Sequence, residues 1–208
     1  MTTKQHQLIK INHHLICFIS LTLITSSYSF SSFHDAEIFH QKQDHIKAIN
    51  ELKPLAEIGD AKAQNLLGKM YYLGQGTPKN IPKGVALLRE AAKKGIPEAQ
   101  GAIGYMHLIG ESGALLDIKL AQDWMTKAAN QGDVNSQYNL AVMYGGKGIK
   151  EDPAKSSHWM RKAAEQGHKY ALNNLAFMHQ EGKGVAKDLV LAHMMYGISY
   201  REGNIAGL

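Results

Sequence analysis

The chain has 208 residues, of which 44% are hydrophobic and 20% are charged, a composition typical of a folded soluble chain. The formal net charge is +5, but the sequence contains no run of five or more Lys and Arg residues, which argues against a nucleic-acid-binding patch. A single cysteine excludes an internal disulfide framework and a cysteine-ligated zinc site.

Residues 1–29 are predicted to form a secretory signal peptide. Lys4 and Lys10 give a basic start, an apolar stretch covers residues 15–24, and Ser27 and Ser29 are small residues at the spacing that a signal peptidase reads. The apolar run is short for a membrane span, which needs about 20 residues, so an uncleaved anchor is the lesser alternative. We therefore expect a periplasmic or secreted protein.

Cys17 lies inside the apolar stretch and follows Ile16, whereas a lipid-attachment cysteine normally follows a small residue. Lipidation is therefore not expected. Cleavage would remove Cys17 with two lysines and leave 21 basic against 18 acidic residues. The chain also contains no Asn-x-Ser/Thr acceptor, which slightly favours a bacterial source.

The rest of the chain repeats with a period of about 36 residues. Closing glycines recur at intervals of 36, 37, 35 and 36 residues, at Gly59, Gly95, Gly132, Gly167 and Gly203. Four methionines keep the same register, at Met70, Met106, Met143 and Met178. A further column holds predicted helix N-caps, at Asn80, Asp117, Asp152 and Asp188.

Each unit is predicted to be a helix, a glycine-rich turn and a second helix. In the first unit, Ala63, Leu67, Met70 and Tyr71 recur at the spacing of one helical face, which strand alternation does not produce. The turn 74–76 then ends this helix, since its glycines tolerate positive φ. The expected fold class is all-α, an α/α solenoid of helix-turn-helix units wound as a right-handed superhelix.

Two stretches carry a family resemblance: Ala-Gln-x-x-Leu-Gly-x-Met-Tyr with Tyr-x-x-Gly-x-Gly in 63–76, and Trp-x-x-Lys-Ala-Ala with the closing glycine in 159–167. They resemble the Sel-one-like repeats (SLR), relatives of the tetratricopeptide repeats. The resemblance covers about residues 34–203. It implies an N-terminal helical pair at 30–60 and four repeats at about 61–96, 97–133, 134–168 and 169–204. It also implies bacterial roles in envelope assembly, signalling or host interaction.

Stacked helix pairs curl and form a concave surface that binds peptides or proteins. The side of each first helix opposite its buried stripe supplies the predicted partner-binding residues: Tyr72, Tyr105, Leu108, Tyr138, Val142 and Phe177. Aromatic side chains are favoured interface anchors, although packing between repeats is the competing interpretation for each. Lys69 and three glutamines are candidates for polar partner contacts or for plain solvation: Gln64, Gln100 and Gln137.

No catalytic, metal-binding or cofactor motif is expected. His107 and His179 occupy the tyrosine column of the repeat, Trp124 and Trp159 occupy a core column, and HExxH and Gly-x-Ser-x-Gly are missing. The leading hypothesis is a noncatalytic adaptor for a protein or peptide. One alternative is a cell-wall or β-lactam-binding hydrolase, as linked to cysteine-rich relatives whose paired cysteines this chain lacks; another is a secreted effector that binds a host protein.

Overall fold

The computed structural model describes residues 32–201, which form ten α-helices and no strand. The helices follow in the order α2 (Phe33–Gln41), α3 (His45–Glu57), α4 (Ala61–Leu73), α5 (Ile81–Lys93), α6 (Pro97–Ile109), α7 (Ile118–Asn130), α8 (Val134–Tyr144), α9 (Pro153–Glu165), α10 (Ala171–Glu181) and α11 (Leu189–Arg201). The predicted signal peptide and Gly203 lie outside the described residues.

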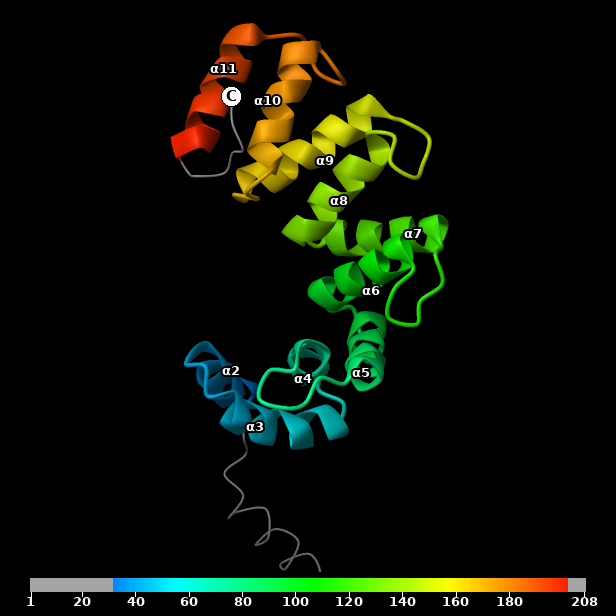
Figure 1. Cartoon of the computed structure of the whole chain (residues 1–208), viewed down its shortest axis with the longest axis vertical. Coiled ribbons are helices and arrows are strands. Elements are labelled where there is room, and N and C mark those ends of the chain that lie inside the picture. The colour runs from blue at the N-terminus through cyan, green and yellow to red at the C-terminus, as the bar shows by residue number, and fades with distance from the viewer. Residues whose placement is uncertain (1–31, 202–208) are drawn as a thin grey trace, which may run out of the picture.

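The helices stack in chain order along the long axis of the molecule, from α2 at one end to α11 at the other (Figure 1). Each helix packs chiefly against the helices before and after it in the sequence. The stack bows, so its two ends lie to the same side of its middle (Figure 1). The predicted all-α repeat solenoid is thus confirmed, and within residues 32–201 no helix has the length and apolar character to cross a membrane.

The repeated polar residues cap the second helix of each unit as predicted. Asn80 Oδ1 accepts a hydrogen bond from the Lys83 backbone N–H at 3.0 Å, and Asp117 Oδ1 accepts one from Leu120 at 2.9 Å. Asp152 and Asp188 form equivalent caps on α9 and α11. A cap satisfies one backbone donor that the first helical turn leaves without an intrahelical partner.

The closing glycines end the second helices. Gly59, Gly95, Gly132 and Gly167 have φ values of +90°, +93°, +96° and +77°, a region that side chains with a Cβ rarely adopt. Each glycine N–H donates to a carbonyl in the last turn of the helix before it, as in Gly132 to Ala129 at 3.0 Å. The chain therefore turns sharply into the next repeat at a fixed position.

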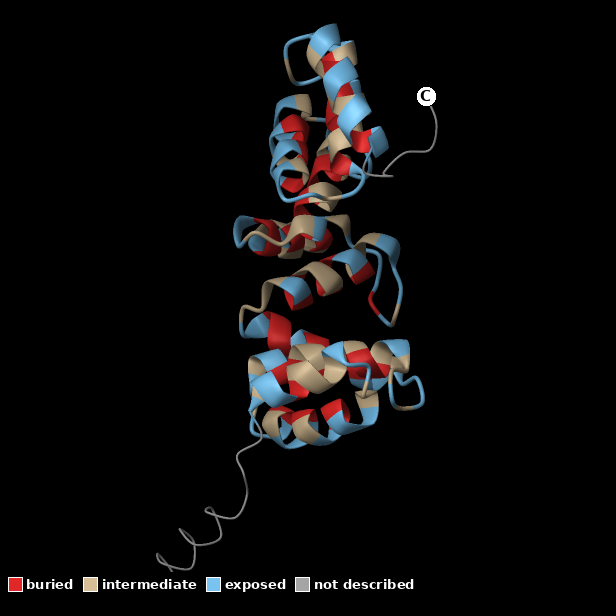
Figure 2. Cartoon of the chain, turned by 90° about the vertical axis from the view of Figure 1, so that its left-hand side faces the viewer, coloured by how far each residue is buried: buried red, intermediate tan, exposed pale blue. Residues whose placement is uncertain are grey.

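Small residues let the two helices of a unit cross closely. A Cβ added to Gly84 on α5 would lie 2.7 Å from the Gly68 carbonyl oxygen and 2.8 Å from the Tyr72 amide nitrogen of α4. Where α8 and α9 cross, Ser156 Oγ donates to the Ala141 carbonyl at 2.7 Å. The resulting buried residues run through every helix pair of the stack (Figure 2).

Candidate partner-binding site

The six predicted binding residues lie on the first helices of the four repeats, but the structure gives them different environments. Tyr105 and Phe177 are exposed, with 47% and 50% of their surface accessible. Tyr72, Leu108, Tyr138 and Val142 are half-buried. The six residues therefore do not form one uniform solvent-facing ladder.

Tyr72 and Tyr105 come together at a cavity of about 300 Å³ between α4, α5 and α6. Its lining is mostly apolar: Lys69, Tyr72, Leu73, Leu88, Ala102, Tyr105, Met106 and Ile109. The Tyr72 hydroxyl lies 3.2 Å from Ser112 Oγ in the loop after α6, and Lys79 Nζ lies 5.9 Å from the Tyr72 ring centroid. These contacts hold one wall of the cavity in place.

Tyr138 is tied to the next repeat. Its ring stacks on that of His168, with centroids 4.1 Å apart and planes 18° apart, and its hydroxyl accepts a hydrogen bond from Asn174 Nδ2 at 3.2 Å. Tyr170 completes this aromatic cluster at 6.4 Å from Tyr138. These contacts favour packing between repeats for Tyr138 over the predicted contact with a partner.

The cluster around Tyr138 depends on a local departure from the repeat. In the last unit the first helix begins at Ala171, four residues after the closing glycine, whereas α4 begins at Ala61, two residues after its glycine. The segment His168–Tyr170 takes the place of the missing half-turn and brings two rings to Tyr138. Burial first, and then the Lys169 charge, lower the pKa of His168. Alignment of the four repeats just after the closing glycine is the sequence signal that indicates this departure.

Val142 and Leu108 also pack between repeats. Val142 lies against the core cluster that contains Met160 and Leu175, and Leu108 lies against the cluster that contains Met125 and Leu140. Phe177 stands half exposed on α10. The structure therefore pairs Tyr72 with Tyr105 and Tyr138 with Val142, without joining all six.

The three glutamines are not surface contacts, and the expectation that they reach a partner or solvent is wrong. Each is buried and donates through Nε2 to a carbonyl at the end of the preceding helix: Gln64 to Ala56 at 3.1 Å, Gln100 to Ala92 at 3.2 Å and Gln137 to Ala129 at 3.1 Å. The closing glycine N–H donates to the same carbonyl in each case. An amide fits this position because a carbonyl oxygen has two lone pairs.

The two later glutamines are also acceptors. Gln131 Nε2 donates to Gln100 Oε1 at 2.8 Å, and Gln166 Nε2 donates to Gln137 Oε1 at 2.7 Å. In the first repeat Lys94 occupies the corresponding position and donates instead to the Gly59 carbonyl at 2.5 Å. Gln64 Oε1 is consequently buried without a hydrogen-bond partner.

A larger groove of about 640 Å³ lies between α2, α4 and the start of α6, the first helices of three successive pairs. Its charged and imidazole side chains are His34, Glu37, His40, Lys62, Lys69 and Glu98. Burial, followed by the His45 and Lys69 charges, lowers the pKa of His40. Lys69 lines both this groove and the Tyr72–Tyr105 cavity, so the two hollows adjoin.

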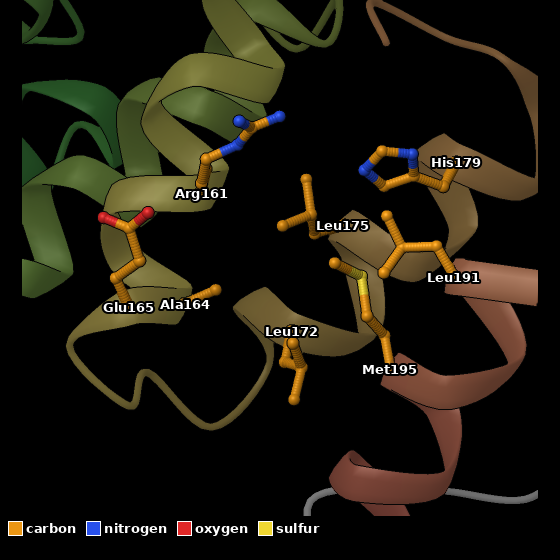
Figure 3. A pocket seen from close by; sticks show the side chains of 8 residues that line it. All are labelled: Arg161, Ala164, Glu165, Leu172, Leu175, His179, Leu191 and Met195. Atoms are coloured by element: carbon orange, nitrogen blue, oxygen red, sulfur yellow. The ribbon is translucent and has the colours of Figure 1, made fainter. Parts of the chain in front are cut away.

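A third hollow, of about 360 Å³, lies between α9, α10 and α11. Leu175, Leu191 and Met195 point into it, while Arg161 and Glu165 stand on its α9 side (Figure 3). Across residues 32–201, no group of three or more His, Cys, Asp or Glu side chains is placed to hold a metal ion.

Helix α11 also exposes large apolar side chains that the sequence reasoning missed. Val190 and Met194 are 73% and 59% accessible. At the position of Met194 the earlier repeats carry Ala86, Asp123 and His158. Alignment of this position across the four repeats is the sequence signal that distinguishes the exposed face of α11.

Comparison with known proteins relates both the sequence and the fold to one repeat family. The Sel1 repeat model matches residues 61–96, 97–133, 134–168 and 169–204 in succession. A Sel1 repeat protein from Oxalobacter formigenes is 25% identical, with a TM-score of 0.74, over 83% of this chain and 70% of that one.

A protective antigen of uropathogenic Escherichia coli strains, which displays an SLR fold, is 32% identical with a TM-score of 0.69 over 76% of this chain. The matched region spans about a third (34%) of that antigen's length. The sequence match over four consecutive units and the shared solenoid agree with the register of glycines, caps and methionines. The chain belongs to the Sel1 repeat family, whose members are protein-interaction scaffolds.

Proposed function

We propose that this protein is a noncatalytic scaffold, exported to the periplasm or outside the cell, that binds a protein or peptide along the surface formed by its first helices. The observation that carries the proposal is the apolar cavity between Tyr72 and Tyr105. Exposed apolar hollows with aromatic walls are favoured anchoring points for partner side chains. Stacked first helices supply such a surface in helical repeat proteins.

The cavity and the neighbouring groove suggest how a partner segment is held. The cavity suits one large apolar side chain, and the adjoining groove offers Lys62 and Lys69 beside Glu37 and Glu98. A chain that places an apolar residue in the cavity therefore meets charged groups of both signs as it continues toward α2. Apolar side chains supply affinity at such sites, while the charged rim contributes orientation and association rate.

Substitution of Tyr105 tests this surface. A partner is first isolated from the source organism with the wild-type chain and identified by mass spectrometry; its dissociation constant is then measured for purified variants. Tyr105→Ala is expected to weaken binding about 30-fold, the equivalent of a hot-spot loss of about 2 kcal/mol. Tyr105 is 47% accessible, so helical circular dichroism should be unchanged.

The matched control is Tyr200→Ala, which removes another exposed tyrosine, 67% accessible, at the far end of the stack. It should bind like the wild type. Equal affinity of Tyr105→Ala and the wild type would remove this surface from consideration. Tyr138 is a poor test residue because its loss also breaks the contacts with His168 and Asn174.

Export is tested separately by the mature N-terminus. If the predicted signal is cleaved, protein from the periplasmic or extracellular fraction begins near residue 30. Membrane-bound protein that retains Met1 would instead support the uncleaved anchor. The hydrolase alternative is tested by incubation with a chromogenic β-lactam and with peptidoglycan, where reproducible turnover would overturn a noncatalytic role. The effector alternative differs only in whether the partner comes from a host.

A further inference from the structure

The hollow between α9, α10 and α11 lies where earlier repeats place a tryptophan. The column that begins with Leu87 continues as Trp124, Trp159 and then Met195. Trp124 packs against the cluster that contains Ala92 and Ile103, and Trp159 packs against the cluster that contains Ala129 and Leu140. The second and third repeats thus fill the same architectural position with an indole ring.

The last repeat keeps the walls of this position but not the ring. Ala164 and Leu175 are the register equivalents of Ala129 and Leu140, and both line the hollow, with Met195 at its edge. A methionine side chain fills less space than an indole and is flexible. Figure 3 shows an open space between these walls, and its volume of about 360 Å³ is within the range of small-ligand sites.

A second substitution makes the hollow more apolar. Leu172 occupies the column of Gln64, Gln100 and Gln137, and it lines the hollow together with Leu175 and Leu191. The position that is a buried amide in the other repeats is therefore aliphatic here. Two departures from the repeat, Met195 and Leu172, meet at one place.

The rim of the hollow carries charges of both signs, Arg161 and Glu165 of α9, and the internal tryptophans also lie beside a cation. Lys127 Nζ lies 4.6 Å from the Trp124 ring centroid, and Lys162 Nζ lies 4.9 Å from that of Trp159. In α11 the equivalent of these lysines is Ile198, but Arg161 lines the hollow from α9 (Figure 3). A guanidinium group is attracted to the face of an aromatic ring and stacks on it well.

We propose that this hollow is a second binding site, distinct from the Tyr72–Tyr105 cavity, and that it accepts an indole-type aromatic group. The ring would lie against Ala164, Leu175 and Met195, as Trp159 lies in the preceding repeat. The group is either the tryptophan side chain of a protein or a free small molecule with the same ring. Burial of the ring supplies the affinity, and Arg161 supplies the cation.

The test follows the ¹⁹F NMR signal of 5-fluoroindole during titration with the full chain. The wild type should shift and broaden this signal. Met195→Trp should fill the hollow from within, lower the affinity for 5-fluoroindole at least tenfold and raise the melting temperature. Met194→Trp is the matched control, because it places the same ring on the adjacent residue, which is 59% accessible, and it should bind the probe like the wild type.

Two further arms distinguish the source of the ring. Three competitors of 5-fluoroindole are compared: N-acetyl-tryptophanamide, a short tryptophan-containing peptide and free indole. Competition that is tightest for the peptide assigns the site to a protein partner. Competition by free indole, with none by the other two, assigns the site to a small molecule. The proposal is overturned if the wild type leaves the signal unchanged up to the solubility limit of the probe. It is equally overturned if Met195→Trp binds the probe as well as Met194→Trp does.

Discussion

Removal of the Gln137 side chain should weaken the contact between the second and third repeats and destabilise the chain. Gln137→Ala removes two hydrogen bonds, to the Ala129 carbonyl at 3.1 Å and from Gln166 at 2.7 Å. At about 0.5–1.5 kcal/mol for each bond, the free energy of unfolding should fall by about 1–3 kcal/mol. The Ala129 carbonyl still accepts from Gly132, so the loss should stay within that range.

Gln64→Ala provides the internal comparison. Gln64 donates one such bond, to Ala56, and its Oε1 has no partner, so the expected loss is about 0.5–1.5 kcal/mol. Urea titrations followed by circular dichroism would measure both variants, and each kcal/mol should correspond to about 2–4 °C in melting temperature for a chain of this size. No loss for Gln137→Ala, or a smaller loss than that of Gln64→Ala, would refute the assignment of these glutamines as contacts that connect successive repeats.

Two other predictions concern helix crossing and pH. Gly84→Ala should lower the free energy of unfolding by up to about 2 kcal/mol, because overpacking against fixed backbone outweighs the gain in helix propensity. Gly197→Ala has nothing within 4 Å of its new Cβ and should raise the free energy of unfolding by up to about 1 kcal/mol. Similar melting temperatures for the two variants would contradict this prediction. Burial lowers the pKa of His40 and of His168 below the unfolded value of about 6.5. The unfolded chain then binds more protons, so this contribution to stability is complete above the unfolded pKa and is lost as the pH falls from there through the lower pKa values of the folded chain. The urea midpoint should drop between pH 7.5 and pH 5, less so in a His40→Gln, His168→Gln double variant; an equal drop in that variant would exclude these two groups as the cause.

Local signals made the fold predictable. The caps at Asn80 and Asp117 and the positive φ at Gly59 and Gly95 depend on neighbours a few residues away, so each repeats wherever its residue type repeats. The apolar stripe of α4 likewise follows from helical spacing. The helices, their ends and their order were therefore predictable from the sequence.

The candidate site was harder to predict because its contacts join different repeats. A glutamine suggests a surface position, yet Gln137 is buried, because the end of the preceding helix offers it a carbonyl. Tyr138 was expected to face a partner, but the late start of α10 brings His168 onto its ring. Tyr72 and Tyr105 do meet at a hollow, and that follows from the separation of α4 and α6, which the periodicity of either helix leaves undetermined.

Site-specific photo-crosslinking tests most directly whether a partner binds at the first-helix surface. A benzophenone amino acid replaces Tyr105 on α6 in one variant and exposed Asp123 on α7 in the other, and irradiation takes place in the source organism. We expect a covalent adduct with one protein, identified by mass spectrometry, from position 105 and not from position 123. An adduct from position 123 with none from position 105 would show that the partner binds elsewhere on the solenoid.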